Sequence, residues 1–241
     1  MKFLQIGSIY AKVLRSIWSG EFLSAETSWA EAVRSIVRTR MGDGHFYADA
    51  FGRAGWDSSL VVANDPLSQG LWAREHGVPA GVDPTRELVR IQVETIRPDV
   101  LFVQDPITYD AAFLRSLGHR PTVVYGWRAA SIPATTDFSG FDFLLTNTEV
   151  CRRKMLAQGA RAVHETQPVF TTEIVRECGD VPLRWDVTFS GQWTPEHAER
   201  NSLLLDLSKS CLSSDLDISL GYFLMKEDSV DLPAGVAMHD Q

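Results

Sequence analysis

Two short apolar runs in this sequence, residues 3–6 and 186–190, are each followed by a glycine and a polar stretch. A buried strand that ends in glycine and leads into a helix offers free backbone N–H groups and the positive end of the helix dipole to a phosphate group. An ordinary strand-to-helix turn has the same pattern, so a purely structural role is the alternative. The candidate diphosphate-binding residues are Gly7, Ser8, Gly191, Gln192, Thr194 and Arg200, the last of them further along the helix expected after Thr194.

Polar and aromatic residues also follow other apolar runs. Asp105 comes directly after the run 99–104, and a carboxylate in that place suits a general base that takes a proton from a hydroxyl group. Aspartate before proline commonly caps a turn, so a structural role for Asp105 is the alternative. Trp127 and Arg128 pair a flat ring with a planar cation, which suits a sugar or a phosphate, although packing explains them as well. The candidate binding residues on this side are Tyr109, Trp127, Arg128 and Asn147.

An alternating series of strands and helices must position these residues. Ser28 and Glu31 have the spacing of a capping box, and apolar residues then recur on one helical face. Alternation at this pace predicts an α/β fold with a Rossmann-like, doubly wound parallel sheet, helices on both faces and loops along one edge. The expected strands are 3–7, 59–63, 99–104, 121–126, 142–146 and 160–164, and the expected helices are 28–37, 46–55, 84–97, 111–117 and 149–158.

The alternation breaks near residues 165–185, which predicts two lobes. We expect an N-terminal Rossmann-like lobe at residues 1–170, an irregular linker at 171–185 and the start of a second Rossmann-like lobe at 186–241. The second lobe should have strands at 186–190 and 216–220 and a helix at 195–210, with Thr194 as its N-cap and Leu203, Leu204 and Leu207 on its buried side. One helix and two strands cannot cover both faces of a sheet, so we expect this lobe to be incomplete.

With these elements in order, the chain resembles glycosyltransferases of the two-lobed GT-B fold, in particular the CgeB-like, glycosyltransferase family 1–4-like group. The segments that carry the resemblance are KFLQIGS, YADAF, DVLFVQD, FDFLLTNTEVCRRKMLAQGA and DVTFSGQWTPEHAERNSLLLDL. The resemblance implies transfer of a sugar from a nucleotide-diphosphate sugar to a hydroxyl group of a glycan, polysaccharide, natural product or lipid-linked acceptor. It implies no cofactor besides that donor. Members of the group are longer than this chain, so the resemblance also implies a truncated form or fragment.

Composition and residue spacing argue against several other classes of partner and site. There are 31 acidic against 23 basic residues, a net charge of -8, and such a surface repels nucleic acid, so no nucleic-acid partner is expected. The six histidines lack the spacing of a zinc site, so no metal is expected. The three cysteines form no CxxC pair, and the N-terminal residues lack a signal-peptide pattern. These features predict a cytoplasmic protein.

Three alternatives stay open at this stage. Aromatic residues near two basic ones in the first helical region suit peripheral contact with an anionic inner membrane face, although core packing explains them too. The other two alternatives are a non-catalytic helper domain that binds a sugar or a partner protein, and a sugar-nucleotide epimerase. The residues of the membrane alternative are Trp18, Phe22, Leu23 and Trp29, beside Lys12 and Arg15.

Overall fold

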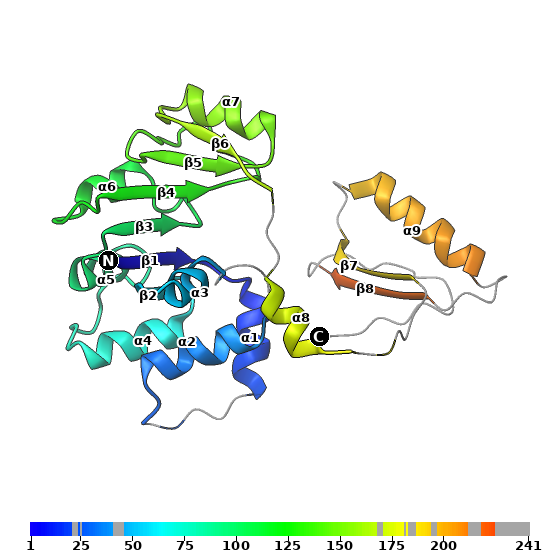
Figure 1. The fold of residues 1–241 in the computed structure, drawn as a ribbon, viewed down its shortest axis with the longest axis horizontal. Helices are drawn as coiled ribbons and strands as arrows, with labels where there is room; N and C mark the ends of the chain where they lie inside the picture. The colour runs from blue at the N-terminus through cyan, green and yellow to red at the C-terminus, as the bar shows by residue number, and fades with distance from the viewer. Residues whose placement is uncertain are drawn as a thin grey trace. The chain divides into compact units, whose positions relative to one another are not determined.

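The chain folds into two compact units, Met1–Ile174 and Val175–Gln241, which are described separately below (Figure 1). The computed structural model describes residues 1–20, 24, 26–40, 46–167, 171–180, 182, 187–193, 197–211 and 218–224. Within this part of the chain, no helix has the combination of length and apolar character that crossing a membrane requires.

The first unit follows the predicted alternation of strands and helices. Its strands are β1 (Lys2–Gly7), β2 (Asp57–Val62), β3 (Val100–Val103), β4 (Val123–Trp127), β5 (Phe143–Thr146) and β6 (Val163–Glu165). Its helices are α1 (Ala11–Gly20), α2 (Trp29–Arg38), α3 (Phe46–Arg53), α4 (Pro66–Glu75), α5 (Glu87–Ile96), α6 (Ala111–Ser116) and α7 (Glu149–Ala157), and α8 (Thr172–Cys178) spans the boundary between the units.

The six strands form a single parallel sheet in the order β2-β1-β3-β4-β5-β6 (Figure 1). From β1 the chain moves to β2 on one side, and from there it crosses back to β3 on the other side. The order of the strands therefore reverses between β1 and β3, which makes this the topological switch point of the sheet. The predicted fold class, an α/β fold with a Rossmann-like parallel sheet, is confirmed.

Helices cover the two faces of the sheet with two separate apolar cores. On one face, Val93 of α5, Phe113 of α6 and Met155 of α7 pack in one cluster with the strand residues that point toward them. On the other face, Leu14 of α1 and Ile36 of α2 belong to a second cluster. A parallel sheet needs cover of this kind on both faces, because its strands are apolar on both sides.

The residues of β1 alternate between these two cores. Leu4 and Ile6 belong to the cluster under α5, and Phe3 belongs to the cluster under α1. Gln5 is the polar exception on the second face, and it is fully buried. Its Oε1 accepts a hydrogen bond from the backbone N–H of Ala48 in α3 at 3.0 Å, so a buried polar group here ties a helix to the central strand.

Of two helix starts described here, the sequence predicted the first, that of α2, and missed the second, that of α4. At α2, Ser28 and Glu31 form the predicted capping box. At α4, Asp65 is the N-cap and its side chain accepts from the backbone N–H of Ser68 at 3.0 Å, with proline at the first helical position. We predicted only a strand end at this point and missed α4. The reason is its buried side, which is mostly polar, so the helix has no apolar repeat: its buried residues are Ser68, Gln69 and Trp72.

The start of α5 also differs from the prediction, which placed it at Pro84. The helix begins at Glu87, because Asp83 accepts hydrogen bonds from the backbone N–H groups of Thr85 at 3.0 Å and Arg86 at 3.2 Å. Asp83 therefore caps a turn before the helix. These backbone hydrogen bonds lower the pKa of the Asp83 carboxyl group below its usual value.

The expected linker at 171–185 is not irregular throughout, since α8 occupies Thr172–Cys178. Glu173 in its first turn forms an ion pair with Arg53 of α3 at 3.6 Å, which attaches the start of α8 to the first unit. The helix has few apolar residues, and Val175 is 59% exposed, so no helical repeat marks it in the sequence.

The second unit contains β7 (Val187–Trp193), α9 (Ala198–Cys211) and β8 (Ile218–Leu224), and its two strands pair in parallel. These elements correspond to the predicted strand, helix and strand. Leu204 is buried on α9 as predicted, but Leu203 is 68% exposed, which corrects the expected buried side. The predicted N-cap Thr194 lies outside the described residues.

One buried side chain of α5 gives a test of the packing. Gln92 is fully buried, and neither its Nε2 nor its Oε1 has a hydrogen-bond partner among the described residues. A buried amide without partners costs about 1–3 kcal/mol, whereas methionine has a similar shape and no such groups. We predict that Gln92→Met raises the free energy of unfolding by about 1 kcal/mol in urea denaturation. A loss of stability would mean that the amide is hydrogen-bonded in solution.

Candidate functional site

The switch point between β1 and β3 places two loops at the carboxyl edge of the sheet. In open α/β sheets ligands bind in the crevice outside the carboxyl ends of the strands at such a point. β1 ends at Gly7 and the loop after it begins with Ser8, and the loop after β3 contains Gln104 and Asp105. The candidate residues from the first lobe therefore belong to one edge of one sheet, as the sequence predicted.

The loop after β1 is held by Asn64, which follows β2. The Oδ1 of Asn64 accepts from the backbone N–H of Ile9 at 2.9 Å, and its Nδ2 donates to the backbone carbonyl of Ile9 at 2.6 Å. The backbone carbonyl of Gly7 accepts from the N–H of Ala63 at 2.9 Å, which continues the ladder between the two strands. This loop then enters α1 at Ala11. We did not predict a role for Asn64, which the sequence marked only as a strand end.

Gly7 has a backbone conformation that other residues can adopt, since it is not among the glycines with positive φ. Its conformation therefore does not require glycine. Glycine leaves the end of the strand beside the switch point without a side chain, and the residue is buried there. Ser8 follows it and is half-buried. Both residues keep the positions predicted for them, and their binding of a diphosphate stays a prediction.

Asp105 has the turn-capping contacts that we gave as its alternative role. Its Oδ1 accepts from the backbone N–H groups of Ile107 at 3.2 Å and Thr108 at 3.4 Å. Its backbone carbonyl accepts from the N–H of Tyr109 at 3.1 Å. The carboxylate therefore caps the turn with one oxygen. No described residue donates a hydrogen bond to the other oxygen, Oδ2.

Tyr109 does not belong to the binding residues, contrary to our prediction. It is 2% exposed, and its ring packs edge-on against Phe113 with the centroids 4.9 Å apart. Its hydroxyl group donates to the backbone carbonyl of Thr85 at 2.7 Å. Burial, and next the charge of Asp105, raise the pKa of this tyrosine well above its usual value. Tyr109 is a core residue with a satisfied polar end.

Trp127 and Arg128 end β4, but their side chains do not act as the predicted pair. Trp127 is half-buried and packs against the core on the α1 side of the sheet. The Nε and Nη2 of Arg128 donate to the backbone carbonyl of Ser131 at 3.2 and 2.6 Å. The guanidinium group therefore holds the loop after β4, and the indole is left as the candidate binding group.

Two amide side chains at this edge carry acceptor oxygens that are buried without a partner among the described residues. They are the Oε1 of Gln104, after β3, and the Oδ1 of Asn147, after β5. Asn147 was predicted as a binding residue and Gln104 was not. The signal in the sequence was present, since Gln104 is a polar residue directly after four buried ones, Val100–Val103.

The predicted donor residues of the second unit need correction. Gly191 does not end its strand, because β7 continues to Trp193 and pairs in register with β8 over its full length. Gly191 pairs with Tyr222 and Gln192 with Phe223, so both backbones belong to the sheet and not to a loop that faces phosphate. The aromatic residue at 193 favours strand extension, which the sequence reading of a turn at glycine overlooked.

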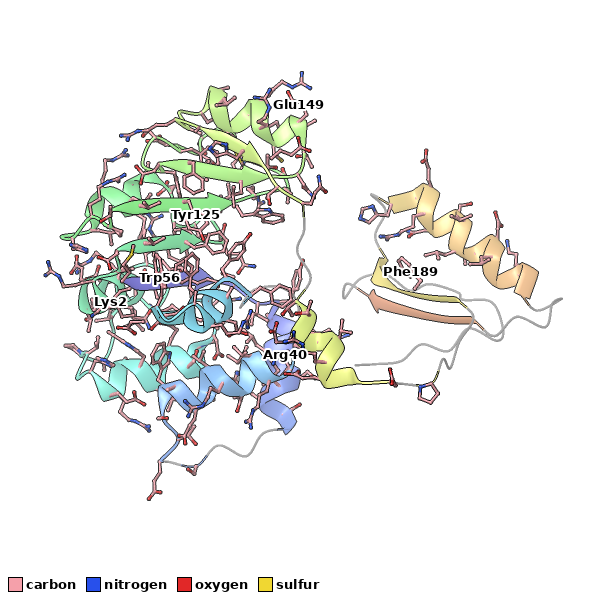
Figure 2. All side chains as sticks on the ribbon, viewed as in Figure 1. Lys2, Arg40, Trp56, Tyr125, Glu149 and Phe189 are labelled. Carbon is pink, nitrogen blue, oxygen red and sulfur yellow. The ribbon has the colours of Figure 1, made fainter. Side chains whose placement is uncertain are left out.

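Arg200 lies on α9, as predicted, and its guanidinium group is placed over the ring of Phe189 in β7 at 5.3 Å from the centroid (Figure 2). One Nη2 donor of Arg200 also reaches the Oδ1 of Asn201 at 3.3 Å. A cation–π contact of this kind anchors the helix to the strand. Its role in binding a diphosphate stays a prediction.

For the two tryptophans that the structure describes, the contacts favour the packing alternative, and membrane contact stays a prediction. The Nε1 of Trp18 donates to the Oδ1 of Asp65 at 2.9 Å, which ties α1 to the cap of α4. Trp29 packs against the core cluster under α5. Both indoles therefore serve internal packing, and Phe22 and Leu23 lie outside the described residues.

No protein-family model matches the sequence, and a comparison with curated proteins gives no match. Among solved structures, the chain is similar to the spinosyn forosaminyltransferase SpnP, with 13% sequence identity and a TM-score of 0.33 over 99% of this chain and 70% of that one. A TM-score of this size does not establish a common fold. Function must therefore be inferred from the geometry of this chain, and membership of the CgeB-like group stays a prediction.

The two hydrogen bonds between Asn64 and Ile9 predict a stability effect. Asn64→Ala removes both bonds and should lower the free energy of unfolding by about 1 kcal/mol. Asn64→Asp keeps the acceptor but places a carboxylate oxygen against the carbonyl oxygen of Ile9, so it should lower the stability at least as much. Urea denaturation of the three proteins measures both changes, and equal stability of all three would contradict this account of the loop.

Proposed function

We propose that this chain is a glycosyltransferase that transfers a sugar from a nucleotide-diphosphate sugar to an acceptor hydroxyl group. The observation that carries the proposal is the switch point between β1 and β3, where β1 ends at Gly7 and the loop that starts with Ser8 leads to the N-terminus of α1. A helix that starts at this edge presents free N–H groups and a positive dipole end, which suit a diphosphate.

The second unit supports the proposal through its order of elements. A strand, a helix and a parallel strand follow one another in β7, α9 and β8, and this is the building unit of mononucleotide-binding sheets. On the helix of this unit, Arg200 stays a proposed cation for a phosphate group of the donor. Gly191 and Gln192 are not proposed as loop residues, because both are paired in β7.

In the proposed reaction the acceptor hydroxyl attacks the anomeric carbon of the sugar, the bond to the diphosphate breaks and the nucleoside diphosphate leaves. The hydroxyl proton needs a base when the reaction inverts the anomeric centre. We assign this role to the Oδ2 of Asp105, since its Oδ1 is held by two backbone N–H groups and fixes the carboxylate in place.

A charge placed at the loop after β1 tests the diphosphate site. We predict that Ser8→Asp weakens the binding of UDP, dTDP or GDP, whichever binds the chain most tightly, by about tenfold or more, because two negative groups then face each other near the helix start. Ser16→Asp makes the same change at an exposed position further along α1 and serves as the control. Isothermal titration calorimetry measures all three proteins. Equal affinity of Ser8→Asp and Ser16→Asp would place the diphosphate elsewhere.

Asp105→Asn separates the catalytic role of this residue from its structural one. Asparagine keeps an oxygen that accepts from Ile107 and Thr108, so the turn and the thermal stability should be unchanged. Transfer needs the proton acceptor, so the rate should fall by about 100-fold or more. Release of nucleoside diphosphate from the donor, with water in place of the acceptor, measures this rate. An unchanged rate at unchanged stability would leave Asp105 as a turn cap only.

A further inference from the structure

The register of the sheet places three residues side by side at its carboxyl edge. Ile6 pairs with Val103, so the next residues, Gly7 and Gln104, are level. In the same way Val103 pairs with Gly126, so Gln104 is level with Trp127. Neighbouring strands are about 4.8 Å apart, so these three positions form a short row across β1, β3 and β4.

Gln104 and Trp127 share the α1 side of the sheet. Trp127 packs against the core on that side. Gln104 directly follows β3, and its backbone N–H continues the ladder by donating to the carbonyl of Ile6 at 2.9 Å, so alternation along the strand puts it on the face of Phe102, which belongs to the same core. The ring of Tyr125, labelled in Figure 2, is stacked between Phe102, at 4.8 Å between centroids, and Phe143, at 5.0 Å. The packed rings of Phe102 and Tyr125 lie two residues before Gln104 and Trp127 along the strands and support them.

The row at the edge contains a buried polar atom without a hydrogen-bond partner among the described residues. This atom is the Oε1 of Gln104. Leaving a buried acceptor unpaired costs free energy, and Gln104 carries this cost at the carboxyl edge, which is where ligands bind in sheets of this kind. Trp127 is half-buried beside it, and Gly7 on its other side has no side chain that could provide a donor.

From this row, and on the basis of the proposed function, we infer that Gln104 and Trp127 form the subsite that recognises a pyranose ring. The indole of Trp127 packs against the C–H face of the sugar, and the Oε1 of Gln104 accepts a hydrogen bond from one of its hydroxyl groups. Asn147 provides a second unpaired acceptor oxygen beyond the end of the next strand, β5.

At Gln104 and Trp127, other ligand groups fit less well. An unpaired amide oxygen repels a phosphate, which also carries only acceptors at neutral pH. The nearest cation in sequence, Arg128, is turned to the carbonyl group of Ser131. A sugar offers what the row lacks, because it has both hydroxyl donors and an apolar face.

The substitution Gln104→Met separates recognition from structure. It removes the unpaired oxygen and keeps the length of the side chain, so it should raise the midpoint of thermal unfolding by about 2–4 °C while it weakens sugar binding. Gln92→Met is the matched control, since it removes another unpaired buried amide on α5, outside the carboxyl-edge row. It should raise the midpoint as well and leave sugar binding unchanged.

The test is saturation-transfer difference NMR on the full chain with the methyl pyranosides of glucose, galactose, mannose and N-acetylglucosamine. We expect at least one of them to bind, with the strongest signals at its ring C–H protons. Affinity for that sugar should fall about tenfold or more in Gln104→Met and in Trp127→Leu. Uridine added as a competitor should leave the sugar signals unchanged.

Four results would overturn the inference: binding of none of the four sugars, unchanged affinity in Gln104→Met, a fall in its unfolding midpoint, or displacement of the sugar by uridine. Titration of the same proteins with UDP, dTDP and GDP tests the proposed function separately. Sugar binding without nucleotide binding would refute the proposed function and retain this subsite. Nucleotide binding without sugar binding would do the reverse.

Discussion

The first unit depends on the parallel pairing of β1 with strands on both of its sides. Its backbone is hydrogen-bonded to β2 and β3, and its side chains enter both cores. A strand so enclosed must be apolar on both faces, and every chain segment that returns to its neighbours must cross over the sheet. The carboxyl ends of the strands therefore lie on one edge of the sheet, together with the loops that follow them.

This constraint explains where the polar exceptions lie. Inside the sheet, Gln5 is buried and its side chain is bonded to α3. At the carboxyl edge, the side chains of Gln104 and Asn147 keep buried oxygens that no described residue satisfies. A polar group that stabilises the fold is expected to be paired, whereas one that serves a ligand is paired only in the complex. Gln92 in α5 is also buried without a partner, so it is the place of Gln104 at the carboxyl edge, together with its unpaired oxygen, that supports a role in binding.

The sequence predicted the strands of the first unit well, because each is a short apolar run followed by a turn signal. The capping box of Ser28 and Glu31 was equally legible, since its spacing has a direct hydrogen-bonding cause. The helix α4 was not predicted, because its buried residues are mostly polar and give no apolar period. The remaining errors concern residues whose place depends on which other segment they pair with. That pairing cannot be read from a single position in the sequence.

The candidate site, too, was predicted from the sequence only in part. The sequence placed Gly7, Ser8 and Asp105 at strand ends, and the structure has them at one edge of the sheet. It could not tell that the hydroxyl group of Tyr109 bonds to a distant carbonyl group, or that β8 extends the pairing of β7 past Gly191. Gln104 was overlooked because its buried oxygen is visible only once its neighbours are placed.

The most direct test of the central claim is hydrogen–deuterium exchange of the full chain with and without saturating UDP, dTDP or GDP. If the carboxyl edge at the switch point is the binding site, peptides with Gly7 to Ala11 and Gln104 to Thr108 should be protected by the nucleotide. Peptides at the opposite edge, such as those with Gly118 to Pro121, should be unchanged. Protection at that opposite edge, with no change at the loops after β1 and β3, would contradict the account.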